Sequence, residues 1–496
     1  MKATAFVHVA DAIGTISPLI YGQFIEHLGR CIYGGLWVGE DSKIPNIRGF
    51  RRDVVEAVKA IRPGIVRYPG GNFASAYHWE DGVGPRAQRP RRWDPTWKCE
   101  ESNQVGTDEF IDWCGMIAAQ PYLCVNAGNG SAEEAARWVE YCNLAGSTSH
   151  AAMRRANGHD RPHGVRYWSI GNELYGDWQI GHMANGKECA LRTRDFAHAM
   201  SCVDPSIELV GVGTRHDPQW NWDMIQGSGR WLKHLSVHCY IHLKQHTLAD
   251  LLAAPEYFGQ ILGHVSGTIS GARRAAKIAH PIRIALDEWN LWYHDVASDN
   301  DPGSHLGQNT SLKDALFTAS VFNVFHRNCG ILSMANYALT VNGLPLIYTH
   351  PDHDGMFCNP QYLAFQLYAN RTGELCVRNH VECDGYASEA TSFYGETCKA
   401  SVPYLDLSTS YSPSTRTLYL HAVNRHETDA VECAFDLRGA MPTAGTAHVL
   451  AGDGPDARND FTRPNAVRLV EQPLSGVGSS FTHRFPPLSA TVIELH

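Results

Sequence analysis

Residues 165–173 read VRYWSIGNE, and the order of residue types in this stretch decides much of the fold. A mostly apolar and aromatic run ends at Gly171, and Asn172 and Glu173 follow directly. A short run of this kind, bounded by a glycine, is typical of a strand that is buried on both faces. The stretch therefore predicts a buried strand that carries an amide and a carboxylate at its carboxyl end.

Seven further runs of the same kind alternate with helical patterns. They are LIYGQFIE (19–26), GIVRYPG (64–70), PYLCVNAG (121–128), IELVGVG (207–213), LSVHCY (235–240), RIALDEW (283–289) and ILSMANYAL (331–339). Amphipathic helices are expected at 50–61 and 310–328, and after Ser131, which forms a capping-box pattern with Glu134. Eight strands that alternate with helices favour an α/β fold, the (β/α)8 TIM barrel. A doubly wound sheet is the main alternative, but no GxGxxG motif follows the first strand.

The residue pattern changes from about residue 378, where polar and apolar residues alternate between clusters of turn residues. This pattern predicts a jelly-roll-like C-terminal β-sandwich over 378–496, after a catalytic barrel over 17–377. The N-terminal run KATAFVHV precedes the barrel. We expect this strand, within residues 1–16, to join the sandwich.

The composition of the chain argues against several classes of protein. The 496 residues carry a net charge of −9, whereas a nucleic-acid binder needs clustered Lys and Arg. No window approaches about 18 consecutive apolar residues, so no membrane span is expected. The N-terminus shows no apolar segment of a secretory signal. The 14 cysteines have no CxxC or Cys/His metal spacing, which indicates a reducing, cytoplasmic location.

Two glutamates follow buried strands directly, Glu173 in SIGNE and Glu288 in ALDEW. In a TIM barrel the chemistry lies at the C-terminal ends of the strands. Two carboxylates at one mouth indicate cleavage of a glycosidic bond, in which one protonates the leaving oxygen and the other attacks the anomeric carbon. The alternative is that each is an ordinary acidic residue at the start of a helix.

Other polar and aromatic side chains at the same strand ends suit a sugar. Asn172 could hold a sugar hydroxyl beside the cleaved bond, and Tyr240 could hold the nucleophilic carboxylate. His238 could orient a carboxylate or the sugar. Further polar residues at strand ends are Asn126, Asn336 and Asn342. Three tryptophans lie in the loops, Trp97, Trp178 and Trp292. Their indole faces could stack on sugar rings, and the alternative is that they are simply packed. No HExxH or HxH pattern predicts a metal site, and no GxSxG predicts a serine hydrolase.

Longer motifs surround these residues. They are YGQFIEHLGRCIYGG (21–35), RYPGGNFASAYHWEDGVGP (67–85), CVNAGNGSAEEAARWVEYCN (124–143), WSIGNELYGDWQIGH (168–182) and ALDEWNLWYH (285–294). Through them the sequence resembles the α-L-arabinofuranosidases of glycoside hydrolase family 51, from about residue 17 through the barrel. The β-rich tail fits the C-terminal sandwich of that family.

The resemblance implies a retaining double-displacement hydrolase that releases terminal α-L-arabinofuranosyl units from arabinan and arabinoxylan fragments. It places the chain in hemicellulose degradation and L-arabinose catabolism, as a cytoplasmic homo-oligomer, often a hexamer, without a cofactor. Glu173 would be the acid/base, kept protonated near neutrality by apolar neighbours and the charge of Glu288, the nucleophile. Substrate contacts are implied for Glu26, Arg67, Asn72, Trp97, Asn172, Trp178, His238, Tyr240 and Trp292.

One position departs from the family pattern. Leu339 in YALTVNGLP stands where many relatives carry Gln, so one polar contact with the sugar is expected to be missing. Two alternatives stay open at this point. One is a β-xylosidase or endo-glucanase of the same clan, and the other is a carbohydrate-binding or scaffold protein without catalysis, against which the pair of glutamates argues.

Overall fold

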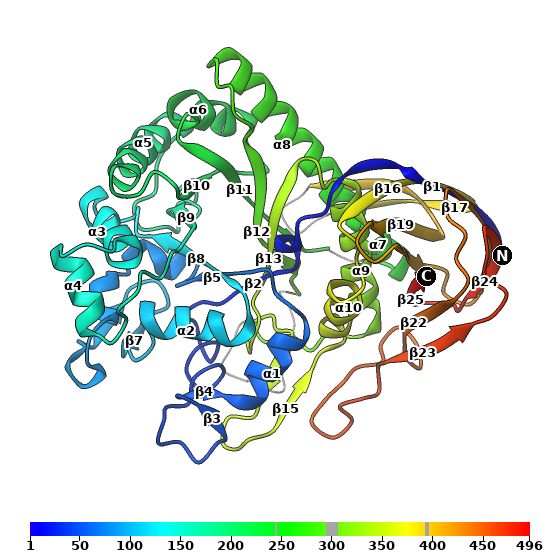
Figure 1. Cartoon of the computed structure of the whole chain (residues 1–496), viewed down its shortest axis with the longest axis horizontal. Helices are drawn as coiled ribbons and strands as arrows, with labels where there is room; N and C mark the ends of the chain where they lie inside the picture. The colour runs from blue at the N-terminus through cyan, green and yellow to red at the C-terminus, as the bar shows by residue number, and fades with distance from the viewer. Residues whose placement is uncertain (244–245, 294–305, 392–395) are drawn as a thin grey trace.

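The structure, a computed structural model, describes residues 1–243, 246–293, 306–391 and 396–496. The chain forms two parts side by side, a barrel surrounded by helices and a curled sheet in which both termini lie (Figure 1). Among the helices of these described ranges, none is long and apolar enough to cross a membrane.

Eight parallel strands close the barrel and follow one another around it in chain order. They are β2 (Gly22–Phe24), β5 (Ile65–Tyr68), β8 (Gln120–Val125), β9 (Tyr167–Ile170), β10 (Glu208–Val212), β11 (Leu232–Ile241), β12 (Arg283–Leu291) and β13 (Leu332–Ala338). Each overlaps one of the eight predicted runs, and the TIM-barrel prediction is confirmed.

Helices cover the outside of the barrel (Figure 1). They are α1 (Arg52–Ala60), α2 (Thr107–Ile117), α3 (Ala132–Asn143), α4 (Ser149–Ala156), α5 (Gly186–Val203), α6 (Pro218–Ser228), α7 (Leu248–Ala253), α8 (Pro255–Ala275), α9 (Leu312–Arg327) and α10 (Pro360–Ala369). The three predicted helices are α1, α3 and α9. Only half of the predicted capping box forms at α3: the Ser131 hydroxyl accepts from the Glu134 amide at 3.1 Å. The Glu134 carboxylate instead bonds His78 at 2.9 Å.

Short elements complete the connections of the barrel. They are η1 (Pro18–Tyr21), β3 (Asn46–Ile47), β4 (Phe50–Arg51), η2 (Asn72–Ala76), η3 (Trp79–Gly82), η4 (Arg86–Gln88), β6 (Arg92–Asp94), β7 (Cys99–Glu101), β14 (Ile347–Thr349) and β15 (Met356–Cys358). The connection from β5 to α2 holds the largest number of them and supplies part of the site described below.

Nine strands form the sheet of the second part, in the order β23-β22-β25-β20-β19-β16-β1-β21-β24. They are β1 (Lys2–Thr15), β16 (Leu375–Cys383), β19 (Leu405–Ser412), β20 (Thr417–Asn424), β21 (Val431–Arg438), β22 (Gly445–Ala451), β23 (Arg468–Leu474), β24 (Ser480–Phe485) and β25 (Ser489–Leu495). Strands β1, β21, β22 and β25 contribute to one apolar cluster, so the sheet curls over a shared core.

The N-terminal strand β1 lies inside this C-terminal sheet, antiparallel to β16 and parallel to β21. The chain enters the sheet at Leu375, slightly before the division expected at 378. The domain boundaries themselves, 17–377 and 378–496, stay predictions.

A hairpin of the second part, β17 (Gly385–Thr391) and β18 (Thr397–Pro403), reaches back to the barrel. Glu396 pairs there with Arg215 at 3.3 Å and with His216 at 2.8 Å. Barrel and sheet are therefore joined by polar contacts close to the carboxyl end of β10, as well as by the apolar packing of α9 and α10 against the sheet.

Apolar side chains fill the barrel interior near the starts of its strands. The cluster contains Ile65, Tyr122, Tyr167, Val210, Ala285 and Met334. One member also supports the layer above, because the Tyr122 hydroxyl donates to Asp287 Oδ2 at 2.8 Å. The barrel is thus a packed core below and a polar site above, as the fold requires.

Candidate active site

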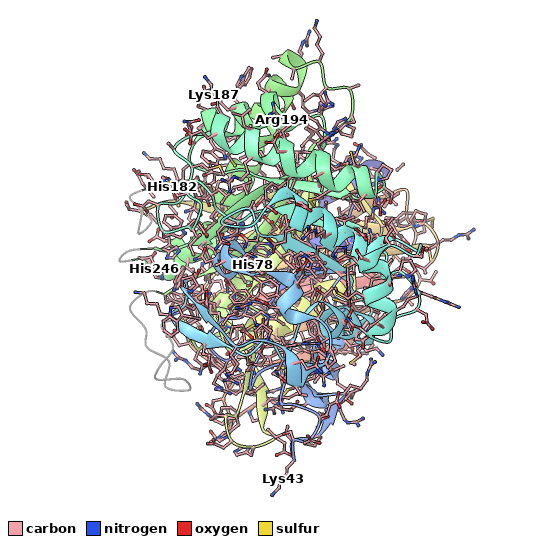
Figure 2. The ribbon with its side chains drawn as sticks, turned by 90° about the vertical axis from the view of Figure 1, so that its left-hand side faces the viewer. Lys43, His78, His182, Lys187, Arg194 and His246 are labelled. Carbon is pink, nitrogen blue, oxygen red and sulfur yellow. The ribbon has the colours of Figure 1, made fainter. Side chains whose placement is uncertain are left out.

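A cavity of about 1190 Å³ lies at the carboxyl ends of the barrel strands. Nine of the eleven predicted site residues line it: Glu26, Asn72, Trp97, Glu173, Trp178, His238, Tyr240, Glu288 and Trp292. The other two, Arg67 and Asn172, are buried beneath them. In the side view of Figure 2, His182 of the cavity wall projects at the same edge of the molecule as His246, which follows β11. The carboxyl ends of the strands face this edge.

Glu173 is carried by a turn directly after β9. Gly171 has φ +82°, and a Cβ there would come within 2.9 Å of the Ala127 and Leu174 side chains. Glu173 itself has φ +42°, which is costly for a residue with a side chain. Hydrogen bonds from Tyr175 Oη at 3.0 Å and Trp178 Nε1 at 3.3 Å hold its carboxylate. The glycine therefore makes the turn that brings the carboxylate into the cavity.

Glu288 on β12 is held by two donors. Arg67 Nη1 donates to Oε1 at 2.6 Å, and the Tyr240 hydroxyl donates to Oε2 at 2.9 Å. The same guanidinium donates through Nη2 to Asn172 Oδ1 at 2.6 Å. A buried charge needs such pairing, and Arg67 keeps Glu288 both oriented and compensated.

The backbone at Gly71 approaches this carboxylate closely. A Cβ at Gly71 would lie 2.7 Å from Glu288 Oε1, closer than van der Waals contact allows. Only glycine leaves the present position of Glu288 free.

One carboxylate oxygen of Glu173 and one of Glu288 lie within 4.8 Å of each other. Retaining glycosidases hold their two carboxyl groups about 5–5.5 Å apart, whereas inverting enzymes leave about 6.5–9.5 Å for a water. An approach of 4.8 Å or less between one oxygen of each carboxylate is consistent with the retaining geometry.

His238 lies between the two glutamates. Its Nδ1 is 2.8 Å from Glu173 Oε1 and 3.4 Å from Glu288 Oε2, and its Nε2 is 3.5 Å from Asp287 Oδ1. Burial opposes a charged imidazole, but the charge of Glu288 and the hydrogen bonds to Asp287 and Glu173 raise the pKa of His238 to about 10. The imidazole is therefore cationic at neutral pH.

This histidine changes the expectation for Glu173. Burial alone would raise the pKa of Glu173, but the hydrogen bond and charge of His238 lower it below its ordinary value. The expected protonated Glu173 is thus not the state that the free site favours. The proton of the Glu173–His238 pair lies on the imidazole, 2.8 Å from the carboxylate oxygen that needs it.

Glu26 and Asn72 form another wall of the cavity. Glu26 Oε1 accepts from the Phe73 amide at 3.0 Å and from Trp97 Nε1 at 3.2 Å, and burial raises the pKa of Glu26 to about 8. Asn72 Oδ1 accepts from Asn172 Nδ2 at 3.2 Å. A carboxyl group and an amide are thus held in place by hydrogen bonds in the cavity that also holds the two glutamates.

The chain matches known proteins over nearly its whole length. Residues 57–251 match the Alpha-L-arabinofuranosidase 1 domain, and residues 287–489 match the Alpha-L-arabinofuranosidase C-terminal domain. The chain is 33% identical to alpha-L-arabinofuranosidase C of Emericella nidulans, over 98% of this chain and 96% of that protein. It is 31% identical to intracellular exo-alpha-(1->5)-L-arabinofuranosidase 1 of Bacillus subtilis, over 100% and 99%.

A solved structure agrees with these matches. The thermostable GH51 alpha-L-arabinofuranosidase of Thermotoga petrophila superposes with a TM-score of 0.92 at 38% identity, over 100% of both chains. The chain belongs to the α-L-arabinofuranosidases of glycoside hydrolase family 51. The resemblance that the sequence motifs carry is thereby confirmed.

Sequence reasoning missed several residues around the site of this arabinofuranosidase-family chain. Tyr175 follows Glu173 by two positions, so proximity to that glutamate was an available signal. Gln179 donates to Asn72 Oδ1, and Arg215 lines the cavity, where its Nη1 donates to the Tyr240 carbonyl at 3.3 Å. Only the fold brings these two to the site.

Three polar strand ends serve the backbone instead of the cavity. Asn126 donates to the Tyr77 carbonyl, Asn336 to the Gln23 carbonyl and Asn342 to the Arg30 carbonyl. Buried backbone carbonyls need hydrogen-bond donors, and these three amides supply them.

Leu339 lines the cavity, as do Leu344 and Phe24. The position that departs from the family pattern therefore does face the site, with an apolar side chain.

A metal ion could in principle use the spacing of Glu173, His238 and Glu288, whose ligand atoms lie within 4.8 Å of one another. The hydrogen bond from His238 and the guanidinium of Arg67 already account for this spacing. The positive charge of Arg67, which already bonds Glu288, disfavours the binding of a metal cation to the same carboxylate.

Proposed function

We propose that the chain is a retaining exo-α-L-arabinofuranosidase in which Glu288 is the nucleophile and Glu173 the acid/base. The observation that carries the proposal is the short separation of the two carboxylates, together with their different partners. Glu288 is held by Arg67 and Tyr240, and Glu173 by Tyr175, Trp178 and His238.

In the first step Glu288 attacks the anomeric carbon, and the bond to the leaving oxygen breaks. Arg67 and Tyr240 fix the carboxylate for this attack without leaving it unpaired. The leaving oxygen takes a proton from Glu173, which receives it from His238 Nδ1 across the 2.8 Å hydrogen bond. The relay supplies a general acid although the pKa of Glu173 is low in the free site.

In the second step a water cleaves the bond between the sugar and Glu288, and Glu173 accepts the proton of that water. The negative charge of Glu288 is absent from the covalent intermediate. Because this charge raises the pKa of His238, its loss lowers the pKa of the pair, so Glu173 stays deprotonated and free to act as the base. The configuration at the anomeric carbon is retained after two inversions.

The sugar would be bound by the remaining residues of the prediction. Glu26, Asn72 and Asn172 would offer acceptors and donors to its hydroxyls. Glu26 and Asn72 line the cavity, and Asn172 donates to Asn72 from beneath it, which supports this role. Trp97, Trp178 and Trp292 line the cavity with indole surface that suits a sugar ring.

A panel of p-nitrophenyl glycosides, with the anomeric configuration followed by NMR, tests the proposal. We expect rapid hydrolysis of the α-L-arabinofuranoside, with retention. Preference for the β-D-xyloside or for a glucan would favour the xylosidase or endo-glucanase alternative, and no hydrolysis of any substrate would favour the non-catalytic one.

We further propose that the enzyme is a cytoplasmic homo-oligomer, a hexamer by the family resemblance, that acts on arabinan and arabinoxylan fragments in hemicellulose degradation and L-arabinose catabolism. The name of the Bacillus subtilis relative supports the intracellular location. Light scattering of the purified chain tests the assembly, and cell fractionation tests the location.

A further inference from the structure

A second cluster of ligating side chains lies outside the cavity. Asp108, His159 and His163 each place one ligand atom within 4.8 Å of the other two. Asp108 is in the first turn of α2, and the two histidines lie between α4 and β9. These residues do not line the cavity described above. We propose that they form a binding site for a divalent transition-metal ion, for which Zn²⁺ is the natural occupant.

The geometry of the three atoms is close to that of a zinc site. Asp108 Oδ1 is 3.0 Å from His163 Nε2 and 3.8 Å from His159 Nε2. Tetrahedral zinc with bonds of about 2.0–2.1 Å places its ligands roughly 3.3 Å apart. Small rotations of the side chains therefore suffice. The same ring atom, Nε2, faces the carboxylate in both histidines.

The chemistry of the donor set selects the kind of ion. Two imidazoles and one carboxylate suit zinc and its neighbours, whereas calcium and magnesium prefer oxygen ligands alone. The side chains of Asp108 and His163 are 8% and 6% exposed, but that of His159 is 24% exposed. The open side gives an ion a route in and leaves room for a water as the fourth ligand.

Neighbouring groups hold the first ligand in place. Tyr141 Oη donates to Asp108 Oδ2 at 2.7 Å, so Oδ1 is left to face the histidines. Asn157 Nδ2 donates to the same Tyr141 hydroxyl at 3.0 Å. Carboxylate ligands in metal sites are oriented by such outer hydrogen bonds.

Backbone contacts fix the segment that carries the histidines. The His159 amide donates to the Arg154 carbonyl at 3.2 Å, and the His163 amide donates to the Cys142 carbonyl at 2.7 Å. Arg154 Nε donates in turn to the His159 carbonyl at 3.1 Å. The backbone that carries both rings is therefore fixed before an ion arrives, which lowers the cost of binding.

A metal at this site would join α2 to the segment that leads into β9, the strand that precedes Glu173. We therefore expect a structural effect: zinc should raise the unfolding temperature without being needed for catalysis. The simpler alternative is a metal-free contact in which Asp108 only accepts hydrogen bonds from the two histidines.

Titration calorimetry of the EDTA-treated full-length chain with Zn²⁺ distinguishes a zinc site from the metal-free contact. We expect one zinc bound at the cluster and a visible absorption band when Co²⁺ replaces it. Asp108→Asn, His159→Ala and His163→Ala should each weaken binding and remove the thermal stabilisation. Tyr141→Phe, which keeps all three ligands, should weaken binding by about 10–100-fold.

Two controls keep the outcome decisive. His380→Ala removes an exposed histidine that pairs with Glu382 at 4.0 Å, and it should leave zinc binding unchanged. Unfolding of each variant in EDTA shows whether the substitution itself disturbs the fold.

Zinc could also bind Glu173, His238 and Glu288, but that event would inhibit the enzyme and persist in Asp108→Asn. If only that event is seen, or if the cluster variants bind zinc like the parent, the proposal is overturned.

Discussion

His238 Nδ1 donates a hydrogen bond to Glu173 Oε1 at 2.8 Å, and this contact places the proton of the acid/base pair on the imidazole. Glu173 lies in the turn after β9 and His238 lies on β11, 65 positions apart in the chain. Their coupling means that pH profiles of this enzyme report the pair rather than Glu173 alone.

Replacing His238 with Gln should move the basic limb of the kcat/KM profile to lower pH. In the parent chain the pair loses its proton at the raised pKa of His238, about 10. Without the imidazole, the proton must sit on Glu173, whose own pKa sets the limb. His182→Gln, in the same cavity wall, is the matched control and should leave the limb in place. An unchanged limb in His238→Gln would show that the proton belongs to Glu173.

Glu173→Ala should spare aryl arabinofuranosides that have good leaving groups and disable those with poor ones. The reason is that an acidic leaving group departs without protonation. Added azide should then give an arabinofuranosyl azide of retained configuration, whereas Glu288→Gly should give no retained adduct. Equal losses on both substrate classes would remove Glu173 from the acid role.

Gly71→Ala should lower kcat by about 100-fold, because its Cβ would lie 2.7 Å from Glu288 Oε1 and displace the nucleophile. Gly115→Ala in α2 is the matched control, since no atom lies within 4 Å of the added methyl group. The control should keep full activity and gain up to about 1 kcal/mol of stability. Parent-like kcat in Gly71→Ala would mean that the carboxylate can move without loss.

Glu26→Gln should become more stable relative to the parent as pH rises from about 4.5 to 8. The folded-state pKa of Glu26 is raised from 4.5 to about 8, so the folded chain prefers the protonated form. Stability from this group is therefore complete below pH 4.5 and is lost as pH rises through about 8, by up to about 1.4 kcal/mol per pH unit. Gln mimics the protonated acid and does not titrate.

Urea unfolding of Glu26→Gln and the parent at pH 5, 6, 7 and 8 measures this difference. A constant difference in the free energy of unfolding across the series would contradict the raised pKa. Activity is a separate readout, because Gln keeps the acceptor for Phe73 and Trp97 but changes the group offered to the sugar.

The sequence alone predicted the order of the eight barrel strands and the two glutamates. Buried parallel strands are continuously apolar, so VRYWSIGNE and RIALDEW are visible without a structure, and the polar residues at their ends stand out. Nine of the eleven predicted site residues line one cavity, because the βα loops of a barrel meet at one face.

Other features depend on contacts between residues that are far apart in the chain. His238 reaches Glu173 only because β9 and β11 flank β10, and this contact reverses the protonation expected for Glu173. Asp108 meets His159 and His163 across more than 50 residues, so no local spacing predicts a metal site there. Sequence determined the strands and their polar ends through local periodicity. The tertiary structure decided which charges face each other, because distance in space sets their interaction energy.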